Sequence, residues 1–242
     1  MSTVGLNQMT TSQSSVGFTT ASVGKKVLMA ITGILLIGFL IVHLIGNLQL
    51  FVGQEQLNKY AETLQSLGAL KWGFRLFMLI LAVVHVWKGI VLWLENQRAR
   101  PVGYRREDTV QASLSSRTMI YTGLLIFFFV VYHLLHFTMI VTNPEYAQLK
   151  DSMGRMDVYS MVISGFSNYF IAAVYLIAMF LLAYHLSHAA ESFFQTMGWA
   201  NDKYLPKLKF LSNVFAVVIF LGYASMPIAV LLEYVTLPGG GF

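Results

Sequence analysis

The chain has 242 residues, of which 56% are hydrophobic and only 11% are charged. A soluble globular domain usually contains about 25% charged residues, so this composition predicts an integral membrane protein. The net charge is +5, but the basic residues form no face interleaved with aromatic residues, so nucleic acid is not an expected partner. Because the chain has no cysteine, disulfides, cysteine-ligated iron–sulfur clusters and the thioether attachment of c-type haem are excluded.

The first 24 residues are polar and rich in serine and threonine. Lys25 and Lys26 follow, and after them comes an apolar run of about 25 residues, which is too long for a signal peptide and long enough to span a membrane. We therefore expect three parts: a polar N-terminal extension (1–24), a membrane domain (25–235) and a short C-terminal tail (236–242).

Five apolar segments of the membrane domain are long enough to cross a bilayer, which takes about 20 residues of α-helix. They are residues 27–51, 73–94, 118–141, 161–190 and 209–233. The expected fold is an all-α integral membrane protein, a five-transmembrane-helix bundle without an internal repeat. The fourth segment is longer than a span requires, so we expect it to tilt or to begin in the interface before 164–168.

Lysine and arginine are unequally distributed between the two sides that five spans would create. Ten of them lie on the side of the N-terminus, in the flank before the first span and in the second and fourth loops, and five lie on the opposite side. Cytoplasmic loops of membrane proteins are enriched in these residues. The N-terminus is therefore expected to be cytoplasmic and the C-terminus to be outside.

All six histidines lie within the spans: His43, His85, His133, His136, His185 and His188. Ionisable side chains at membrane depth are costly, and they are functional candidates by default. At about 1.5 Å per helical residue, His43 and His133 lie roughly 25 and 24 Å from the inner surface, whereas His85 and His185 lie roughly 15 and 9 Å from it. The outer and inner pairs indicate two cofactors stacked across the membrane, each held by two imidazoles.

Other interpretations of these histidines stay open at this point, including simple hydrogen bonding to a neighbouring helix. Residues three apart share a helix face, so His136 or His188 could replace its neighbour as a ligand. Depth in the membrane mildly favours His133 over His136 as the outer ligand and does not decide between His185 and His188 as the inner one. No carboxylate lies near either level, so haem iron fits better than a zinc or copper site. Glycines nearby would leave room for a flat macrocycle or, equally, allow close helix packing.

Four short segments occur in order, one on each of the first four spans. They are Thr32-Gly33 with His43 in GILLIGFLIVHLIGN, His85 in LAVVHVWKG, Thr122-Gly123 with His133 in TGLLIFFFVVYH, and His185 in YHLSHAAESFFQTMGW. Over residues 25 to about 235 the chain resembles the b558-type di-haem cytochrome b anchor of succinate dehydrogenases and fumarate reductases.

The resemblance implies two haem b groups, each with two histidine ligands. His85 and His185 would hold the proximal haem, and His43 and His133 would hold the distal haem. Matching the fourth segment selects His185 over His188, and matching the third agrees with His133 over His136.

The same resemblance implies an anchor subunit of succinate dehydrogenase in the cytoplasmic (inner) membrane of a bacterial or archaeal cell. Flavoprotein and iron–sulfur subunits would oxidise succinate, and this chain would pass the electrons to a membrane quinone, with menaquinone expected. The complex could also oligomerise. Some quinol-oxidising fumarate reductases of the family carry a glutamate on the fourth span before the haem ligand. Here FLLAYHLSH has no acid before Glu191, which favours succinate oxidation over fumarate reduction.

Contacts to the cofactors are expected near the histidine levels. Lys88, three residues after His85, and Arg117, at the start of the third span, are candidate partners of the haem propionates, although lysines near span ends also snorkel. The candidate quinone contacts are Tyr60, Glu62 and His136 on the outer side and Ser22, Lys25 and Trp199 on the inner side.

Two other functions compete with this prediction. Another di-haem b subunit, such as that of respiratory nitrate reductase, also has four histidine ligands, but on two helices rather than four. A haem-free transporter with a histidine proton relay would be expected to have acidic residues in its spans and broken helices. Here only Pro227 interrupts a span, and Glu233 lies at the edge of that span, so the transporter is less favoured. The spread of the histidines over four helices makes the nitrate reductase type less favoured.

Overall fold

The computed structural model describes residues 22–99 and 114–239. In chain order the helices are α1 (Ser22–Asn47), α2 (Gln54–Ser66), α3 (Ala69–Arg98), α4 (Leu114–His133), α5 (Val158–Phe166), α6 (Tyr169–Thr196) and α7 (Leu205–Leu231). Three short helical turns are η1 (Leu48–Phe51), η2 (Leu134–Thr138) and η3 (Pro144–Gln148). Among these described residues there is no β-strand, only an isolated bridge between Lys150 and Met156.

Five helical segments are long and apolar enough to cross a membrane. They are Ser22–Phe51, Ala69–Arg98, Ser116–Thr138, Tyr169–Thr196 and Leu205–Leu231. The expectation of an all-α chain with five spans is confirmed. The first helix begins at Ser22, inside the expected polar extension, and residues 1–21 lie outside the described part of the chain.

The fourth span begins later than the sequence segment 161–190 indicates. Residues 161–166 belong to the separate helix α5, and α6 starts at Tyr169. The side-chain oxygen of Asn168 accepts hydrogen bonds from the backbone N–H groups of Phe170 (3.0 Å) and Ile171 (3.2 Å). Asparagine is a favourable N-cap because it satisfies amides that lack a partner within the helix. The chain therefore breaks at this residue and starts a new helix.

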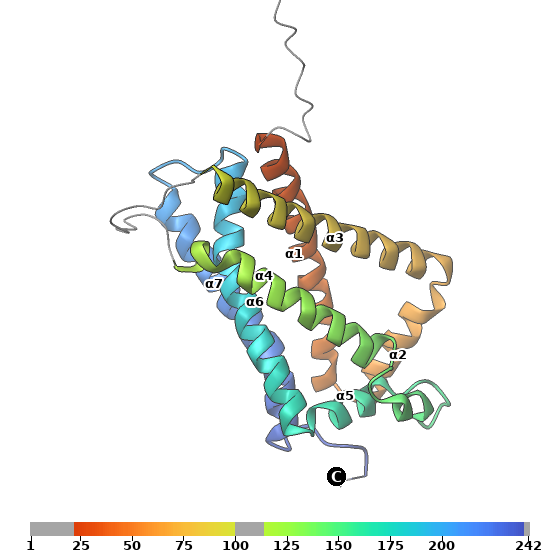
Figure 1. The fold of residues 1–242 in the computed structure, drawn as a ribbon. Helices are drawn as coiled ribbons and strands as arrows, with labels where there is room; N and C mark the ends of the chain where they lie inside the picture. The colour runs from red at the N-terminus through yellow and green to blue at the C-terminus, as the bar shows by residue number, and fades with distance from the viewer. Residues whose placement is uncertain (1–21, 100–113, 240–242) are drawn as a thin grey trace, which may run out of the picture.

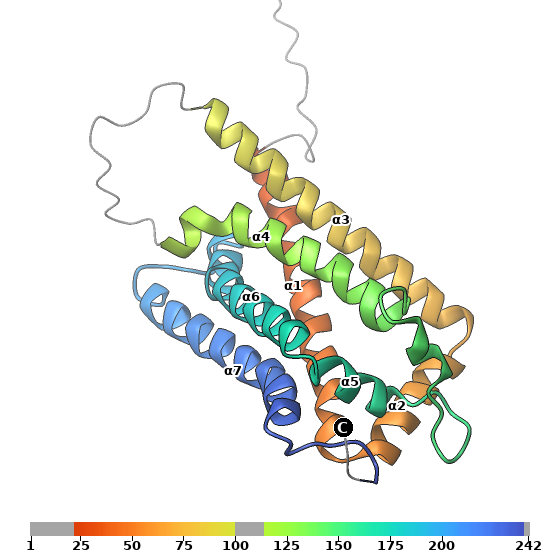
Figure 2. The ribbon, with the colours of Figure 1, turned by 60° about the horizontal axis from the view of Figure 1, so that its bottom comes forward.

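The spans pack in pairs, as Figures 1 and 2 show from two directions. Helix α6 lies along α7, whereas α3 packs across α1 and α4 packs across α6 at an angle. Contacts between α1 and α6 join these pairs. Many apolar side chains of α3 and α4 are exposed, which is expected of helices that face lipid. We call the end of the bundle where α1 begins the near end and the opposite end the far end.

A group of short elements lies across the far end (Figure 1). We call this group the cap: α2, η3, the loop 149–157 and α5. Asn58 of α2 is fully buried there. Its amide donates to Asp157 (2.9 Å) and Asp151 (3.2 Å), and its side-chain oxygen accepts from the backbone N–H of Tyr159 (3.0 Å). One amide thus ties α2 to both the loop and α5.

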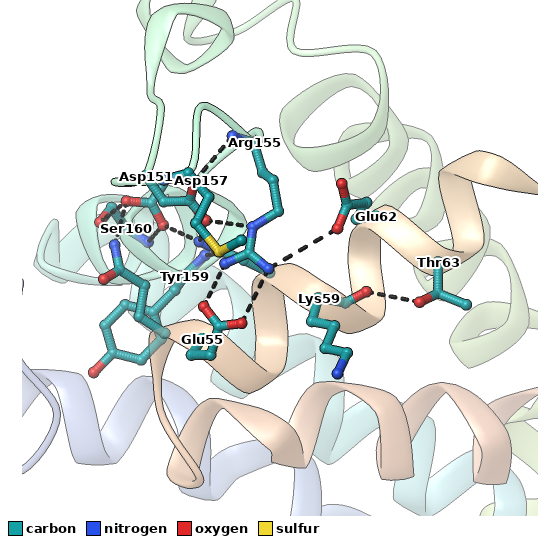
Figure 3. Close-up of polar contacts among 12 residues, drawn as sticks. Glu55, Lys59, Glu62, Thr63, Asp151, Arg155, Asp157, Tyr159 and Ser160 are labelled. Atoms are coloured by element: carbon teal, nitrogen blue, oxygen red, sulfur yellow. Dashed lines mark hydrogen bonds and ion pairs between the residues drawn. The ribbon is translucent and has the colours of Figure 1, made fainter.

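Charged side chains complete the cap (Figure 3). Arg155 donates from Nε to Asp151 (2.8 Å) and from Nη1 to Glu55 of α2 (3.2 Å). The hydrogen bond from Arg155 holds the pKa of Glu55 below its ordinary value. Burial raises the pKa of Asp157, but hydrogen bonds from Ser160, Asn58 and other donors outweigh it, so the pKa is lowered overall. The cap therefore depends on ionised carboxylates.

Candidate functional site

Two of the three histidines in the near half of the bundle, His85 on α3 and His185 on α6, form what we call the near level. Each meets a threonine of a neighbouring helix. Oγ1 of Thr32 on α1 lies 3.2 Å from Nδ1 of His85, and Oγ1 of Thr122 on α4 lies 3.1 Å from Nδ1 of His185. The helices that supply these residues also contact one another, α1 with α6 and α3 with α4.

The direction of these hydrogen bonds follows from the other contacts of each threonine. Oγ1 of Thr32 lies 2.9 Å from the carbonyl oxygen of Leu28 and 3.0 Å from that of Met29. Thr122 has the same arrangement with two carbonyls of its own helix, at 3.2 and 3.1 Å. A hydroxyl has a single hydrogen, and here it goes to a carbonyl. The threonine oxygen then accepts from Nδ1–H of the histidine, which leaves Nε2 with a free lone pair, the form that binds a metal.

A glycine follows each of these threonines and faces the same imidazole. A Cβ atom at Gly33 would lie 3.3 Å from Cε1 of His85, and one at Gly123 would lie 3.3 Å from Cε1 of His185. Both distances are short for a Cβ contact, so a larger residue would push the ring aside. The two glycines thus allow the imidazoles to approach, in addition to any role in helix packing.

These contacts correct the expectation that the chain contains no internal repeat. Six residues of α1 recur in α4 at a constant spacing of 90 positions. The two sets are Met29, Thr32, Gly33, Leu35, Phe39 and His43 in α1, and Met119, Thr122, Gly123, Leu125, Phe129 and His133 in α4. Each set receives a histidine from the next long helix, α3 or α6. The equivalent surroundings of His85 and His185 follow from this local repeat.

His43 and His133 form what we call the far level. Their ring centroids are 5.9 Å apart, and the rings are nearly perpendicular, at 80°. A phenylalanine one helical turn earlier stacks on each ring: Phe39 on His43 at 5.3 Å and Phe129 on His133 at 6.1 Å. The structure therefore brings together His43 and His133, the two histidines that are predicted to pair from their depth along the spans.

His136 follows His133 by three residues, and an ordinary helix would place both on one face. The turn η2, which begins directly after His133, is a π-helix. A π turn holds more residues than an α turn, so the angle between the two side chains differs from that in an α-helix. His136 is 0% exposed and stacks on Phe137 at 4.0 Å, and its Nδ1 lies 3.0 Å from the hydroxyl of Tyr175. Its Nε2 atom has no partner among the described residues.

The remaining polar candidates lie toward the near end. His188 is half-buried and within electrostatic range of Glu191 and Lys209. Lys88 is half-buried on α3, one turn from His85, and Arg117 is exposed near the start of α4. Their roles as propionate partners stay predictions.

The quinone candidates do not come together in one place. At the far end, the ring of Tyr60 lies against Gly46, one turn beyond His43, where a Cβ would be only 2.6 Å from the phenol oxygen. Glu62, by contrast, is exposed on α2 and lies 3.9 Å from Arg155. Tyr60 is therefore closer than Glu62 to the far histidines.

The candidates at the near end have other partners. Lys25 forms an ion pair with Glu95 of α3, and Trp199 packs against Phe193 with ring centroids 5.9 Å apart. Ser22 is exposed at the first residue of α1. Their part in quinone binding stays a prediction.

Tyr175 is the functional candidate that the sequence does not indicate. Its hydroxyl lies 3.3 Å from Nδ1 of His133 as well as 3.0 Å from Nδ1 of His136. Tyr175 is 42 residues away from His133 in the chain, on another helix, so no local pattern connects them. The hydrogen bonds of Thr32 and Thr122, by contrast, can be predicted from the repeat.

No family model, no curated protein and no solved structure matches the chain.

Proposed function

We propose that this chain is the di-haem cytochrome b anchor of a succinate:quinone oxidoreductase. It would work as succinate dehydrogenase with flavoprotein and iron–sulfur partners, and would pass electrons to a membrane quinone, with menaquinone favoured. The observation that carries the proposal is that four spanning helices supply two pairs of imidazoles at two depths. Near-level His85 and His185 would hold the proximal haem, and far-level His43 and His133 the distal haem.

The spacing of the far rings and the hydrogen bonds of the near rings support this cofactor. Two imidazoles on one metal have ring centres about 6 Å apart, since each metal–nitrogen bond is about 2 Å long, and the rings of His43 and His133 are 5.9 Å apart. At the near level, Thr32 and Thr122 leave Nε2 of both histidines free to bind iron. Among the described residues, no three histidine or acidic side chains come together as a metal site. A cofactor that needs two protein ligands suits such pairs.

The chain's own residues would orient and insulate the cofactors. The threonines fix the tautomer and rotation of the near imidazoles, because a ligating histidine is oriented by the partner of its other nitrogen. The glycines Gly33 and Gly123 give those rings room, and Phe39 and Phe129 pack on the far rings. When bound, haem with two imidazole ligands supplies one-electron transfer and has no open position for oxygen. Lys88 and Arg117 would contact the propionates.

The proposal is tested by a reduced-minus-oxidised absorption spectrum of the purified chain. We expect a b-type signal from two haems in the wild type, loss of the proximal haem in His85→Ala and loss of the distal haem in His133→Ala. His188→Ala is the matched control, because it removes a half-buried histidine of α6 that is not an assigned ligand, and it should keep both haems. A wild-type chain without b-type signal would overturn the proposal and favour a haem-free proton relay.

A further inference from the structure

One buried hydroxyl lies between two histidines near the far end. Tyr175 of α6 is 6% exposed, and its oxygen is within hydrogen-bonding distance of Nδ1 of both His133 and His136. Aromatic side chains enclose the group, with Phe129 and Phe166 packed on the Tyr175 ring at 4.9 and 5.0 Å. Because the hydroxyl is buried among aromatic side chains, the direction of one of its two hydrogen bonds determines the direction of the other.

The number of hydrogens on these atoms restricts the arrangement. The hydroxyl has one hydrogen to donate and lone pairs that accept. A neutral imidazole has a hydrogen on one nitrogen only. If both contacts are hydrogen bonds and both rings are neutral, two arrangements are possible. In the first, one Nδ1 donates to Tyr175 and the other accepts from it. In the second, both rings donate, and the hydroxyl hydrogen has no partner. A buried hydroxyl hydrogen without a partner is unfavourable, so His133 and His136 hold opposite tautomers.

The proposed ligand role of His133 decides which tautomer belongs to which ring. A histidine ligates a metal through a nitrogen that carries no hydrogen, so ligation through Nε2 places the hydrogen of His133 on Nδ1, from which it donates to Tyr175. The hydroxyl of Tyr175 then donates to Nδ1 of His136. His136 therefore carries its hydrogen on Nε2, the atom that has no partner among the described residues.

We propose that Tyr175 is a positioning residue that fixes opposite tautomers in two neighbouring histidines, with His133 able to ligate iron through Nε2 and His136 unable to do so. Which ring holds which tautomer rests on the proposed function, whereas the opposite states follow from the shared hydroxyl. The arrangement explains how two adjacent histidines are kept from competing for one cofactor. It gives His133 the same state that the threonines give His85 and His185.

The tautomers are measured by ¹⁵N NMR of the purified full chain with ¹⁵N-labelled histidine, reduced with dithionite, and His133→Gln and His136→Gln variants assign the signals. We expect a hydrogen on Nδ1 of His133 and on Nε2 of His136. In Tyr175→Phe, at least one of the two rings should change or mix its tautomers. The opposite assignment, or unchanged tautomers in Tyr175→Phe, would overturn the inference. Opposite tautomers are measured whether or not haem is bound, so this part of the inference does not depend on the outcome for the proposed function.

A second measurement tests the effect on the cofactor through the midpoint potentials of the two haems. A hydrogen bond from Nδ1–H makes an imidazole a stronger electron donor, so Tyr175→Phe should raise the potential of the distal haem and leave the proximal one unchanged. Tyr184→Phe is the matched control, since the hydroxyl of Tyr184 is buried on the same helix without a partner among the described residues. Equal shifts in both variants, or no shift in Tyr175→Phe, would contradict the inference.

Discussion

The near and far levels hold their histidines by different means. At the near level, His85 and His185 each contact a threonine and a glycine of one adjacent helix, and the two arrangements repeat each other. At the far level the neighbours differ: the ring of Tyr60 from α2 lies one turn beyond His43, whereas His133 meets the hydroxyl of Tyr175. The two near histidines thus have equivalent neighbours, whereas the two far histidines have different ones.

The difference follows from what covers each end. The near level is built within the helix pairs α1–α3 and α4–α6, so its geometry depends on local contacts between two helices. The far level is next to the cap, where Asn58 and Arg155 tie segments that are about a hundred residues apart in sequence. We therefore expect changes in the repeat to act on the near level and changes in the cap to act on the far level.

The largest effect is expected from Gly33→Val, because its side chain would occupy the space of the His85 ring. On the proposed function, the proximal haem should be lost and the distal haem kept, which halves the haem content per chain. Gly38→Val is the matched control on the same helix, since a Cβ there meets nothing within 4 Å. Haem content and the redox spectrum measure the outcome. Equal loss in both variants would mean that helix packing, and not the imidazole, is affected.

A large loss of stability is expected from Asn58→Leu, because it removes one of the buried donors to Asp157 and leaves the backbone N–H of Tyr159 without its partner. A buried group without a partner costs about 1–3 kcal/mol, so the free energy of unfolding should fall by at least this amount. Thermal unfolding and protease cleavage of the loop 149–157 measure it. Gln56→Leu, an exposed change on the same helix, should have little effect. A distal haem that stays as stable as in the wild type would break the link between cap and far level.

The hydroxyl contact at the near level is expected to have a smaller effect. Thr122→Val keeps the size of the side chain but removes the acceptor of His185 Nδ1–H. Loss of such a partner typically weakens metal binding by about 10–100-fold, and haem titration of the chain measures this. Ser225→Ala removes a hydroxyl that bonds only its own helix, to the carbonyl of Gly222, and should leave affinity unchanged. If both variants bind haem like the wild type, the threonine does not orient the ligand.

The partners of the near histidines are more predictable from the sequence than those of the far histidines, for a physical reason. Apolar length predicts the five spans, and depth along them pairs His43 with His133. A repeat within α1 and α4 also makes the threonine contacts predictable. The π turn after His133, the break at Asn168 and the position of Tyr175 are not predictable in this way, because each depends on packing between distant segments.

Acid should open the cap before it affects the near level. The pKa values of Glu55, Asp151 and Asp157 are all lowered in the folded chain. Groups with lowered pKa values stabilise the fold above their ordinary pKa of about 4 and lose this contribution as the pH falls through the folded value. Protease cleavage at 149–157 should therefore stay constant from pH 7 to about 4 and rise below it. Asp157→Asn should weaken the pH dependence, and a cap that becomes more stable in acid would contradict the assignment.

The smallest effect is expected from the ion pair between Lys25 and Glu95, which joins the start of α1 to the last turn of α3 at the near end. The Glu95 side chain is 40% exposed, so water screens the pair, and pairs of this kind contribute about 0–1 kcal/mol. A double-mutant cycle of Lys25→Met and Glu95→Gln, read by thermal unfolding, should give a coupling energy within that range. A coupling energy as large as the stability lost in Asn58→Leu would show that polar contacts stabilise the near end as much as the far end. The contrast between a near level fixed by helix-to-helix contacts and a far level fixed by a polar cap would then fail.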